Sequence, residues 1–255
     1  MANVRRFRIA VKNGSVATVS QIVGDGRPLA LICRGLTGDL TRQSSIDALA
    51  AEQAKVGWSS VRFDFRGRGE ASQSAGLPTV TSMLEDLGAV LNWVKDKTGQ
   101  EPNAIIARGF GSRLALECLE SNPHIPIVMW APIVWLQTSL ELRGRLHEFR
   151  RYAKLVIDGT EIQSNFLTSL RDPDDAMIRS WIAPDRRHVI IHPQEDKVVP
   201  LELARELWKI MQGAGAKVAF VEVPGAHPHP DKNVSGQIQA VLGSLLSQHS
   251  KGDPE

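Results

Sequence analysis

Residues that could carry chemistry stand in short segments that each follow an apolar run. Residues 107–111 (Ala-Arg-Gly-Phe-Gly) form one of these segments, Asp196 stands in a second, and His227 and His229 stand in a third. Carboxylate and imidazole groups are the usual partners in proton transfer. Covalent acyl transfer needs an oxygen or sulfur nucleophile as well, and Gly109 at the centre of the first segment offers none.

The elements that must position these residues alternate along the chain. Apolar runs are predicted to be strands at 29–33, 60–65, 104–107, 125–130, 189–192 and 218–223. Amphipathic patterns predict helices at 45–55, 80–94, 203–211 and 238–246. Residues 4–19 are expected to form an antiparallel edge hairpin that turns at Asn13-Gly14. The alternation predicts an α/β fold with a mostly parallel sheet and helices on both faces.

One segment interrupts this alternation. Residues 133–186 show helical patterning without a convincing strand, broken and restarted at 172–175 (Asp-Pro-Asp-Asp). Such an insertion would lie over the carboxyl edge of the sheet, where open α/β proteins bind ligands. We therefore expect a core of residues 1–132 and 187–247, a small helical cap of residues 133–186, and a frayed tail of residues 248–255.

Three local patterns, in this order, resemble the α/β-hydrolase superfamily, and the resemblance covers nearly the whole chain. The first is residues 33–38 (Cys-Arg-Gly-Leu-Thr-Gly), where the family carries a His-Gly loop. Arg34 stands in place of that His, and the resemblance makes the Leu36 N–H a donor of the oxyanion hole. The second is an Asp-x-Arg-Gly-x-Gly loop, in which Asp64 and Arg66 would pin the backbone path with charge-assisted hydrogen bonds.

The third pattern resembles the nucleophile elbow, Gly-x-Ser-x-Gly between a strand and a helix. Gly109 stands where the family has its Ser, and Phe110 would supply the second oxyanion-hole N–H. Ser112 and Cys118 lie further along the expected helix and are interpreted as packing residues. The elbow is therefore expected to be present without its nucleophile.

The resemblance also supplies an acid and a base. Asp196 stands where the family's acid precedes x-Val-x-Pro, with Glu195 a lesser candidate. His227 fits the position of the family's His, and His229 is the alternative base; in the family the Asp fixes the imidazole tautomer. No metal site is expected, because prolines separate His227, His229 and Asp231.

These residues leave three hypotheses open for function. The chain is an esterase, thioesterase or acyltransferase from which the nucleophile was removed, for example to trap a substrate. It is alternatively a natural acid–base enzyme (lyase, isomerase or non-covalent acyl transferase) in which His227 activates a water or hydroxyl in the space beside Gly109. The third hypothesis is a catalytically inactive ligand-binding protein. No cofactor is expected, and a dinucleotide-binding fold is the weak alternative.

The cap is expected to select the substrate. Residues 130–135 (Trp-Ala-Pro-Ile-Val-Trp) resemble a stretch of the serine aminopeptidase-like and exosortase-associated hydrolases. An apolar acyl pocket or, alternatively, packing of the cap onto the sheet is predicted for Trp130, Trp135, Phe149, Phe166 and Trp181. A solvated helix face or, alternatively, a docking patch for an acidic carrier protein or a phosphate-bearing substrate is predicted for Arg143, Arg145, Arg150, Arg151 and Lys154.

Composition limits the remaining possibilities. The chain has 255 residues, 42% hydrophobic and 23% charged, with a formal net charge of +2. This near-balance argues against nucleic acid as the partner, since such binding needs a basic face. No apolar run reaches the length of a membrane span, and the only two cysteines, Cys33 and Cys118, lie in apolar runs. We expect a cytoplasmic protein with a small-molecule acyl substrate, free or bound to a carrier protein.

Overall fold

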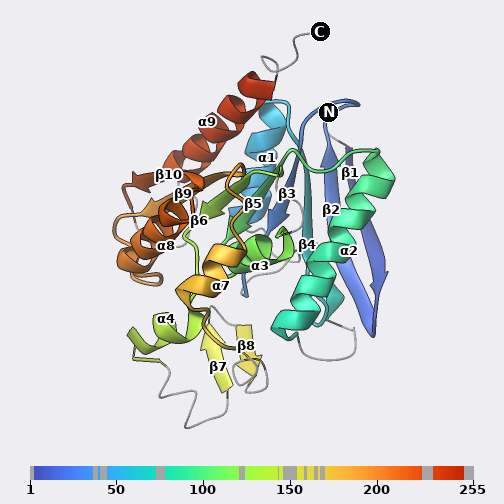
Figure 1. Ribbon diagram of the computed structural model, residues 1–255. Helices are drawn as coiled ribbons and strands as arrows, with labels where there is room; N and C mark the ends of the chain where they lie inside the picture. Colours follow the sequence, from blue (N-terminus) through green and yellow to red (C-terminus); the bar gives the residue numbers. More distant parts are fainter. Residues whose placement is uncertain are drawn as a thin grey trace.

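A twisted eight-stranded sheet runs through the computed structural model, with helices on both faces (Figure 1). The structure describes residues 3–36, 40, 45–72, 78–120, 124–142, 144–145, 154–157, 160–163, 166, 170–225 and 232–249. The sheet, in spatial order, consists of β1 (Asn3–Val11), β2 (Gly14–Ile22), β4 (Ser59–Asp64), β3 (Leu29–Cys33), β5 (Ala104–Arg108), β6 (Ile127–Trp130), β9 (Arg187–Pro193) and β10 (Lys217–Val223).

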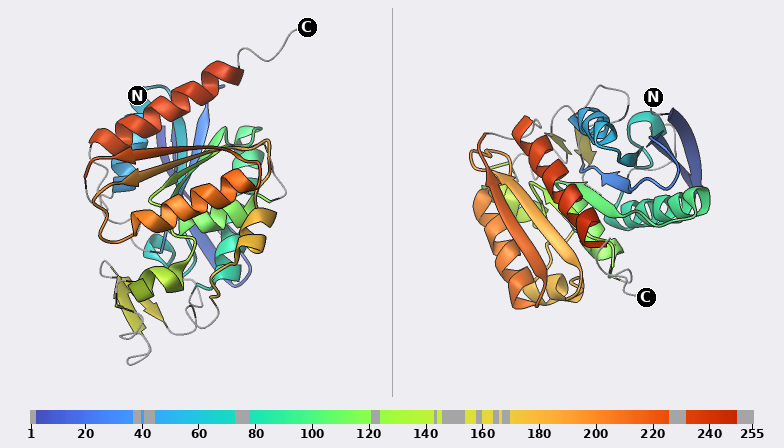
Figure 2. Two further views of the ribbon diagram at one scale, coloured as in Figure 1. Left: turned by 60° about the vertical axis from the view of Figure 1, so that its left-hand side comes forward. Right: turned by 90° about the horizontal axis from the view of Figure 1, so that it is seen from above.

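Helices cover the two faces in separate groups (Figure 2). One face carries α1 (Ser45–Lys55) and α9 (Lys232–His249), which contact each other. The other carries α2 (Val80–Thr98), α3 (Gly111–Cys118) and α8 (Leu201–Gly213). Each group packs its apolar stripe onto its own side of the sheet, so the core has two layers. The α/β-hydrolase arrangement predicted from the sequence is confirmed.

The central strands are the most buried: β3, β4 and β6 are buried along their whole length, and β5 is buried up to its last residue. β3 pairs with β4 and β5, and β6 pairs with β5 and β9, all in parallel register. The predicted edge hairpin is also confirmed: β1 and β2 are antiparallel from Asn3–Ile22 to Val11–Gly14, and Asn13 has a φ of 62°. The turn therefore uses the left-handed conformation that Asn tolerates.

The segment between β6 and β9 is not purely helical, so that part of the prediction is wrong. It contains α4 (Leu136–Leu142) and α7 (Asp175–Ser180), but also the antiparallel strands β7 (Lys154–Ile157) and β8 (Thr160–Gln163). The predicted break at 172–175 is confirmed, because Asp174 caps α7 by accepting a hydrogen bond from the Met177 N–H at 2.8 Å. The boundaries of the cap stay a prediction.

At the end of the described chain, α9 continues through His249 and so includes the first two residues of the expected tail, while residues 250–255 lie outside the described part. Within the described residues, no helix is long and apolar enough to cross a membrane.

Candidate active site

Gly109 occupies the sharp turn between β5 and α3. Its φ is +54°, a left-handed conformation that strains any residue with a side chain. The turn is tied on both sides: the Gly109 N–H donates to the Trp130 carbonyl at 3.0 Å, and the Gly109 carbonyl accepts from the Ile133 N–H at 2.9 Å. Within the described part of the chain, a Cβ at Gly109 would meet only Ile133 Cδ1 within 4 Å, at 3.7 Å. The turn thus has room for a side chain although it carries none.

Two other glycines, Gly35 and Gly111, allow the loop after β3 and the turn after β5 to approach each other closely. A Cβ at Gly111 would lie 2.6 Å from the Cys33 carbonyl oxygen and 2.7 Å from the Arg34 carbonyl oxygen. A Cβ at Gly35 would lie 3.2 Å from the Phe110 nitrogen. The loop after β3 and the turn after β5 therefore pack backbone against backbone, and this closeness is the structural reason for glycine at both positions.

This packing sets two amide groups beside the turn. Among the described residues, neither the Leu36 N–H nor the Phe110 N–H has a hydrogen-bond acceptor. Both residues are otherwise buried. Unpaired backbone donors next to a candidate reaction centre are what an oxyanion hole requires. The roles predicted for Leu36 and Phe110 are compatible with this geometry and stay predictions.

Neither Ser112 nor the cysteines offer a substitute nucleophile. The buried Ser112 hydroxyl donates back to the Ala107 carbonyl at 3.2 Å. Burial raises the pKa of the Cys118 thiol to about 11, with Glu117 as a further cause, and burial raises the pKa of Cys33 as well. Since the thiolate is the reactive form, both cysteines are unreactive here.

Asp196 lies in the loop between β9 and α8, with its side chain fully buried. One carboxylate oxygen accepts from the N–H groups of Val198 at 2.7 Å and Val199 at 2.8 Å. It does not cap α8, because the N-cap of that helix is Pro200 and has no side-chain hydrogen bond. The carboxylate is held by its own loop.

The sequence reasoning missed His192, a buried histidine at the end of β9. Its Nε2 lies 4.0 Å from the other carboxylate oxygen of Asp196 and 3.1 Å from the Val199 carbonyl. The spacing of four residues between His192 and Asp196 was the available signal. A strand followed by a loop does not place such a pair predictably, so the signal was weak.

The two candidate bases, His227 and His229, lie outside the described residues. The chain just before them is described and lies against the loop of Asp196. The Glu195 N–H donates to the Gly225 carbonyl at 3.0 Å, and the Gln194 N–H donates to the Val223 carbonyl at 2.8 Å. The segment that carries His227 therefore begins beside the candidate acid.

An open groove of about 740 Å³ adjoins Asp196. It is lined by residues of the α4 end, the β9–α8 loop and the start of α8: Leu142, Arg145, Gln194, Glu195, Asp196, Lys197, Pro200, Leu201 and Glu202. Most of these side chains are polar or charged. The groove differs in that respect from the apolar aromatic pocket that the sequence analysis predicted.

The predicted pocket aromatics are integrated into the core. Trp130 is buried, with the Arg108 guanidinium over its ring at 4.9 Å, and Trp135 donates from its indole N–H to the Pro173 carbonyl at 2.9 Å. Phe166 is buried against Phe110, and Trp181 is buried as well. These contacts match the packing alternative, and their contact with a substrate stays a prediction. Phe149 lies outside the described residues, as do Arg143, Arg150 and Arg151.

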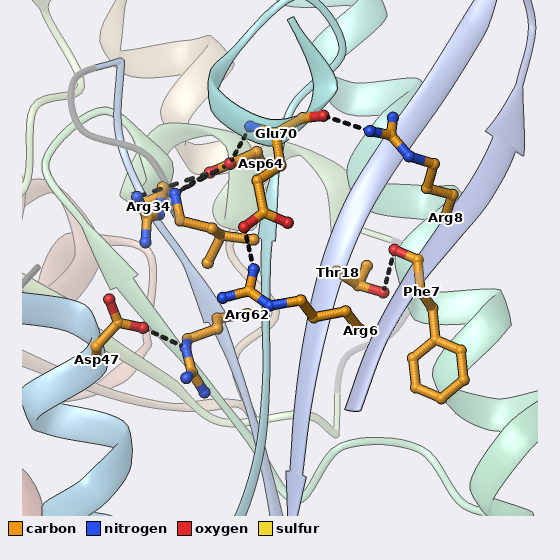
Figure 3. Close-up of polar contacts among 10 residues, drawn as sticks. Arg6, Phe7, Arg8, Thr18, Arg34, Asp47, Arg62, Asp64 and Glu70 are labelled. Atoms are coloured by element: carbon orange, nitrogen blue, oxygen red, sulfur yellow. Dashed lines mark hydrogen bonds and ion pairs between the residues drawn. The ribbon is translucent and has the colours of Figure 1, made fainter. Parts of the chain in front are cut away.

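The loop after β4 is pinned by charge, as its sequence predicted. Arg66 donates from its backbone N–H at 2.9 Å and from Nε at 2.7 Å to the buried Asp86. Asp64 accepts from the Glu70 N–H at 3.0 Å. Its carboxylate also contacts the loop after β3, through Arg34 and Leu40 (Figure 3).

No group of three His, Cys, Asp or Glu side chains could hold a metal ion within the described part of the chain. His227, His229 and Asp231 lie outside it.

Comparison with known proteins gives one family match and several relatives. A family model described as Hydrolase_4, serine aminopeptidase S33, matches residues 29–224. Lysophosphatidylserine lipase ABHD12 from Macaca fascicularis is 25% identical over 215 residues, covering 79% of this chain and 51% of its own length. The same lipase from Rattus norvegicus is 23% identical over 246 residues, covering 91% and 58%. The chain spans about half the length of the curated relatives it matches.

Similar solved structures share the fold. Est1E from Butyrivibrio proteoclasticus, bound to ferulic acid, has a TM-score of 0.73 at 18% identity, over 94% of this chain and 99% of that chain. The Pyrococcus furiosus esterase Pf2001 has a TM-score of 0.73 at 16% identity, over 97% and 91%.

Proposed function

The chain belongs to the serine aminopeptidase S33 family of α/β-hydrolases, and from this premise we propose that it binds an acyl ester or thioester at the turn of Gly109. The acyl carbonyl would lie against the N–H groups of Leu36 and Phe110. Asp196 and His227 would form the acid–base pair, with His229 as the alternative base. The nucleophile is missing, so the covalent step of the family cannot occur on this chain as it stands.

A single observation supports this proposal most strongly: the turn at Gly109 has the strained, left-handed backbone of a nucleophile elbow. Gly109 holds a φ of +54°, and a Cβ placed there would have an ordinary contact with Ile133 at 3.7 Å as its only contact with described residues. A hydroxyl at this position would project from the same strained turn that exposes a nucleophile in this fold. Restoring the side chain is therefore the natural test.

The second candidate is non-covalent chemistry on the glycine protein. The open position beside Gly109 favours it, since Ile133 is the only neighbour of the Cβ position among the residues that the structure describes. His227 would take a proton from water or an acceptor hydroxyl while that oxygen attacks the acyl carbonyl. The same imidazole would then return the proton to the departing alkoxide or thiolate. An inactive binding protein is the remaining alternative.

The test compares Gly109→Ser with Gly109→Ala, which adds the Cβ without the hydroxyl. The substrates are short p-nitrophenyl esters, an aryl thioester, a lysophospholipid and a ferulate ester, the last two because of the relatives named above. We expect Gly109→Ser to give a burst of about one product per protein molecule, and Gly109→Ala to give none. The burst should disappear when His227→Ala is added.

Each other outcome favours a different hypothesis. Turnover by the glycine protein that is lost in His227→Ala, together with no burst in Gly109→Ser, would replace the proposal with non-covalent chemistry. Tight ligand binding without turnover in any variant would favour the binding protein. A cytoplasmic location and substrate delivery by a carrier protein stay part of the proposal, and a carrier-bound thioester in the panel tests the latter.

A further inference from the structure

We propose that Arg34 and Asp64 form a positioning pair that holds the oxyanion loop after β3 in shape. The inference rests on the proposed function, because it concerns the Leu36 N–H of the same site. It goes beyond the sequence prediction, which gave Asp64 a role only in its own loop. The pair acts through the loop backbone and touches no substrate.

Arg34 is the first residue of this loop and is buried, with 2% of its surface exposed. Its Nη1 lies 3.7 Å from an oxygen of Asp64, whose side chain is fully buried. A buried guanidinium is stable only where a carboxylate compensates its charge. The pair therefore holds Arg34, and with it the start of the segment that leads to Leu36.

The same carboxylate also holds the far end of the segment. The Leu40 N–H donates to both oxygens of Asp64, at 3.1 and 3.0 Å. Arg34 and Leu40 thus bracket Gly35 and Leu36 and are fixed to one rigid group at the end of β4. Fixing these two residues limits the backbone freedom of Gly35 and Leu36, which is what preorganised oxyanion donors require.

Asp64 is in turn part of a wider network (Figure 3). It accepts from the Glu70 N–H at 3.0 Å, and Glu70 is tied to β1 through an ion pair with Arg6 and a hydrogen bond from Arg8 to its carbonyl. Side chains on the edge hairpin therefore help to immobilise the carboxylate.

The cavity beside the pair is too small to be a substrate site. It has a volume of about 10 Å³, is lined by Arg34, Leu36, Asp64 and Arg68 among others, and could hold one water molecule at most. A positioning role fits this geometry, whereas substrate binding does not.

Asp86 provides a matched control. It is as buried as Asp64 and, like Asp64, contacts both a backbone N–H and an arginine side chain, here the N–H and the Nε of Arg66. Its partner Arg66 belongs to the loop after β4 rather than to the oxyanion loop. Asp86→Asn should therefore lower the free energy of unfolding without changing the backbone order of Leu36.

The first measurement needs no activity. Backbone ¹⁵N order parameters of Gly35 and Leu36 are compared in Asp64→Asn, Asp86→Asn and the unchanged protein. We expect values near 0.85 in the unchanged protein and in Asp86→Asn, and a fall toward about 0.6 in Asp64→Asn. Arg34→Met should show the same fall, and Arg34→Lys should restore part of the order because it keeps the charge.

The second measurement uses the Gly109→Ser background. Asp64→Asn there should lower kcat about tenfold or more with little change in KM, since a misplaced donor affects the transition state more than binding. Asp86→Asn should leave both constants within about twofold. Unchanged order at Gly35 and Leu36 in folded Asp64→Asn would overturn the inference. If Gly109→Ser is inactive, the proposed function fails, but the order parameters still decide the role of the pair.

Discussion

The turn of Gly109 and the loop of Asp196 lie at the carboxyl ends of β5 and β9, yet they keep their shapes by different means. The turn is held by backbone packing at Gly35 and Gly111 and by main-chain hydrogen bonds. The loop is held by one carboxylate that binds two N–H groups. A nucleophile can therefore be lost without changing its turn, whereas Asp196 cannot be lost without loosening its own loop.

This difference changes what the presence of the candidate acid Asp196 says about activity. An inactive protein would be expected to lose its acid as well as its nucleophile, but Asp196 has a structural task that is independent of catalysis. Its presence is thus weaker support for activity than the sequence suggests. The free N–H groups of Leu36 and Phe110 are the better support, because they stabilise nothing else among the described residues.

The largest expected effect is at the backbone-packed turn. Gly111→Ala would place a Cβ 2.6 Å from the Cys33 carbonyl oxygen, so the chain must shift, at a cost of about 3 kcal/mol in the free energy of unfolding. Chemical denaturation measures the change. Gly88→Ala in α2 is the control, since its Cβ would meet nothing within 4 Å and should stabilise the helix. A loss below 1 kcal/mol for Gly111→Ala would contradict the tight packing.

The next largest effect is at Asp196, where two substitutions distinguish a structural role of the carboxylate from a catalytic one. Asp196→Ala leaves the N–H groups of Val198 and Val199 without their acceptor and should cost about 2 kcal/mol. Asp196→Asn keeps one oxygen, to which both groups bond, and should be nearly as stable as the unchanged protein. Both variants should abolish the burst in the Gly109→Ser background. Equal stabilities for the Ala and Asn variants would refute the structural role of the carboxylate.

The dependence of stability on pH tests the opposite end of β9, where His188 lies. His188 is buried, and neither ring nitrogen has a partner among the described residues. Burial, with Arg186 as a further cause, lowers the pKa of His188 from 6.5 to about 3. The unfolded chain takes up this proton below pH 6.5 and the folded chain does not, so stability should be lost as pH falls from about 6.5 toward 3, by about 1.4 kcal/mol per pH unit.

His188→Leu should flatten this acid-side slope in a series of denaturation curves from pH 7 to pH 4. His124→Leu is the control, because His124 is exposed. An identical slope in His188→Leu would show that the acid sensitivity arises elsewhere.

The smallest expected effect is at Gly109 itself. Gly109→Ala must hold a φ of +54° but, of the residues described, meets only Ile133, so it should cost about 1 kcal/mol in unfolding free energy. Thermal denaturation compares it with Gly111→Ala. A cost as large as that of Gly111→Ala would mean that the turn has no room for a side chain.

The sequence predicted an element of the fold well where the residues that determine that element lie within one short segment. Asn13-Gly14 predicted its hairpin, and the apolar stripe of residues 45–55 predicted α1 with the observed bounds. The hairpin of β7 and β8 was missed because each strand has four residues, which are too few to show a recognisable alternation of apolar and polar side chains.

The candidate site was predicted in part. The position of Gly109 and the loop of Asp196 followed from family patterns, whereas the contact of Arg34 with Asp64 joins loops thirty residues apart and depends on strand order. The burial of Trp130 depends likewise on which face of β6 it occupies, and a short strand buried on both faces gives no alternation to show it.

The central claim is that the turn of Gly109 would direct a side chain introduced at position 109 toward the oxyanion donors and the acid–base pair. Gly109→Ser, Gly109→Ala and the unchanged protein are incubated with a fluorophosphonate and analysed by intact and peptide mass spectrometry. We predict one phosphonyl group per molecule of Gly109→Ser, on the peptide that contains position 109, and none on the other two proteins. A folded Gly109→Ser protein that stays unlabelled would contradict the claim.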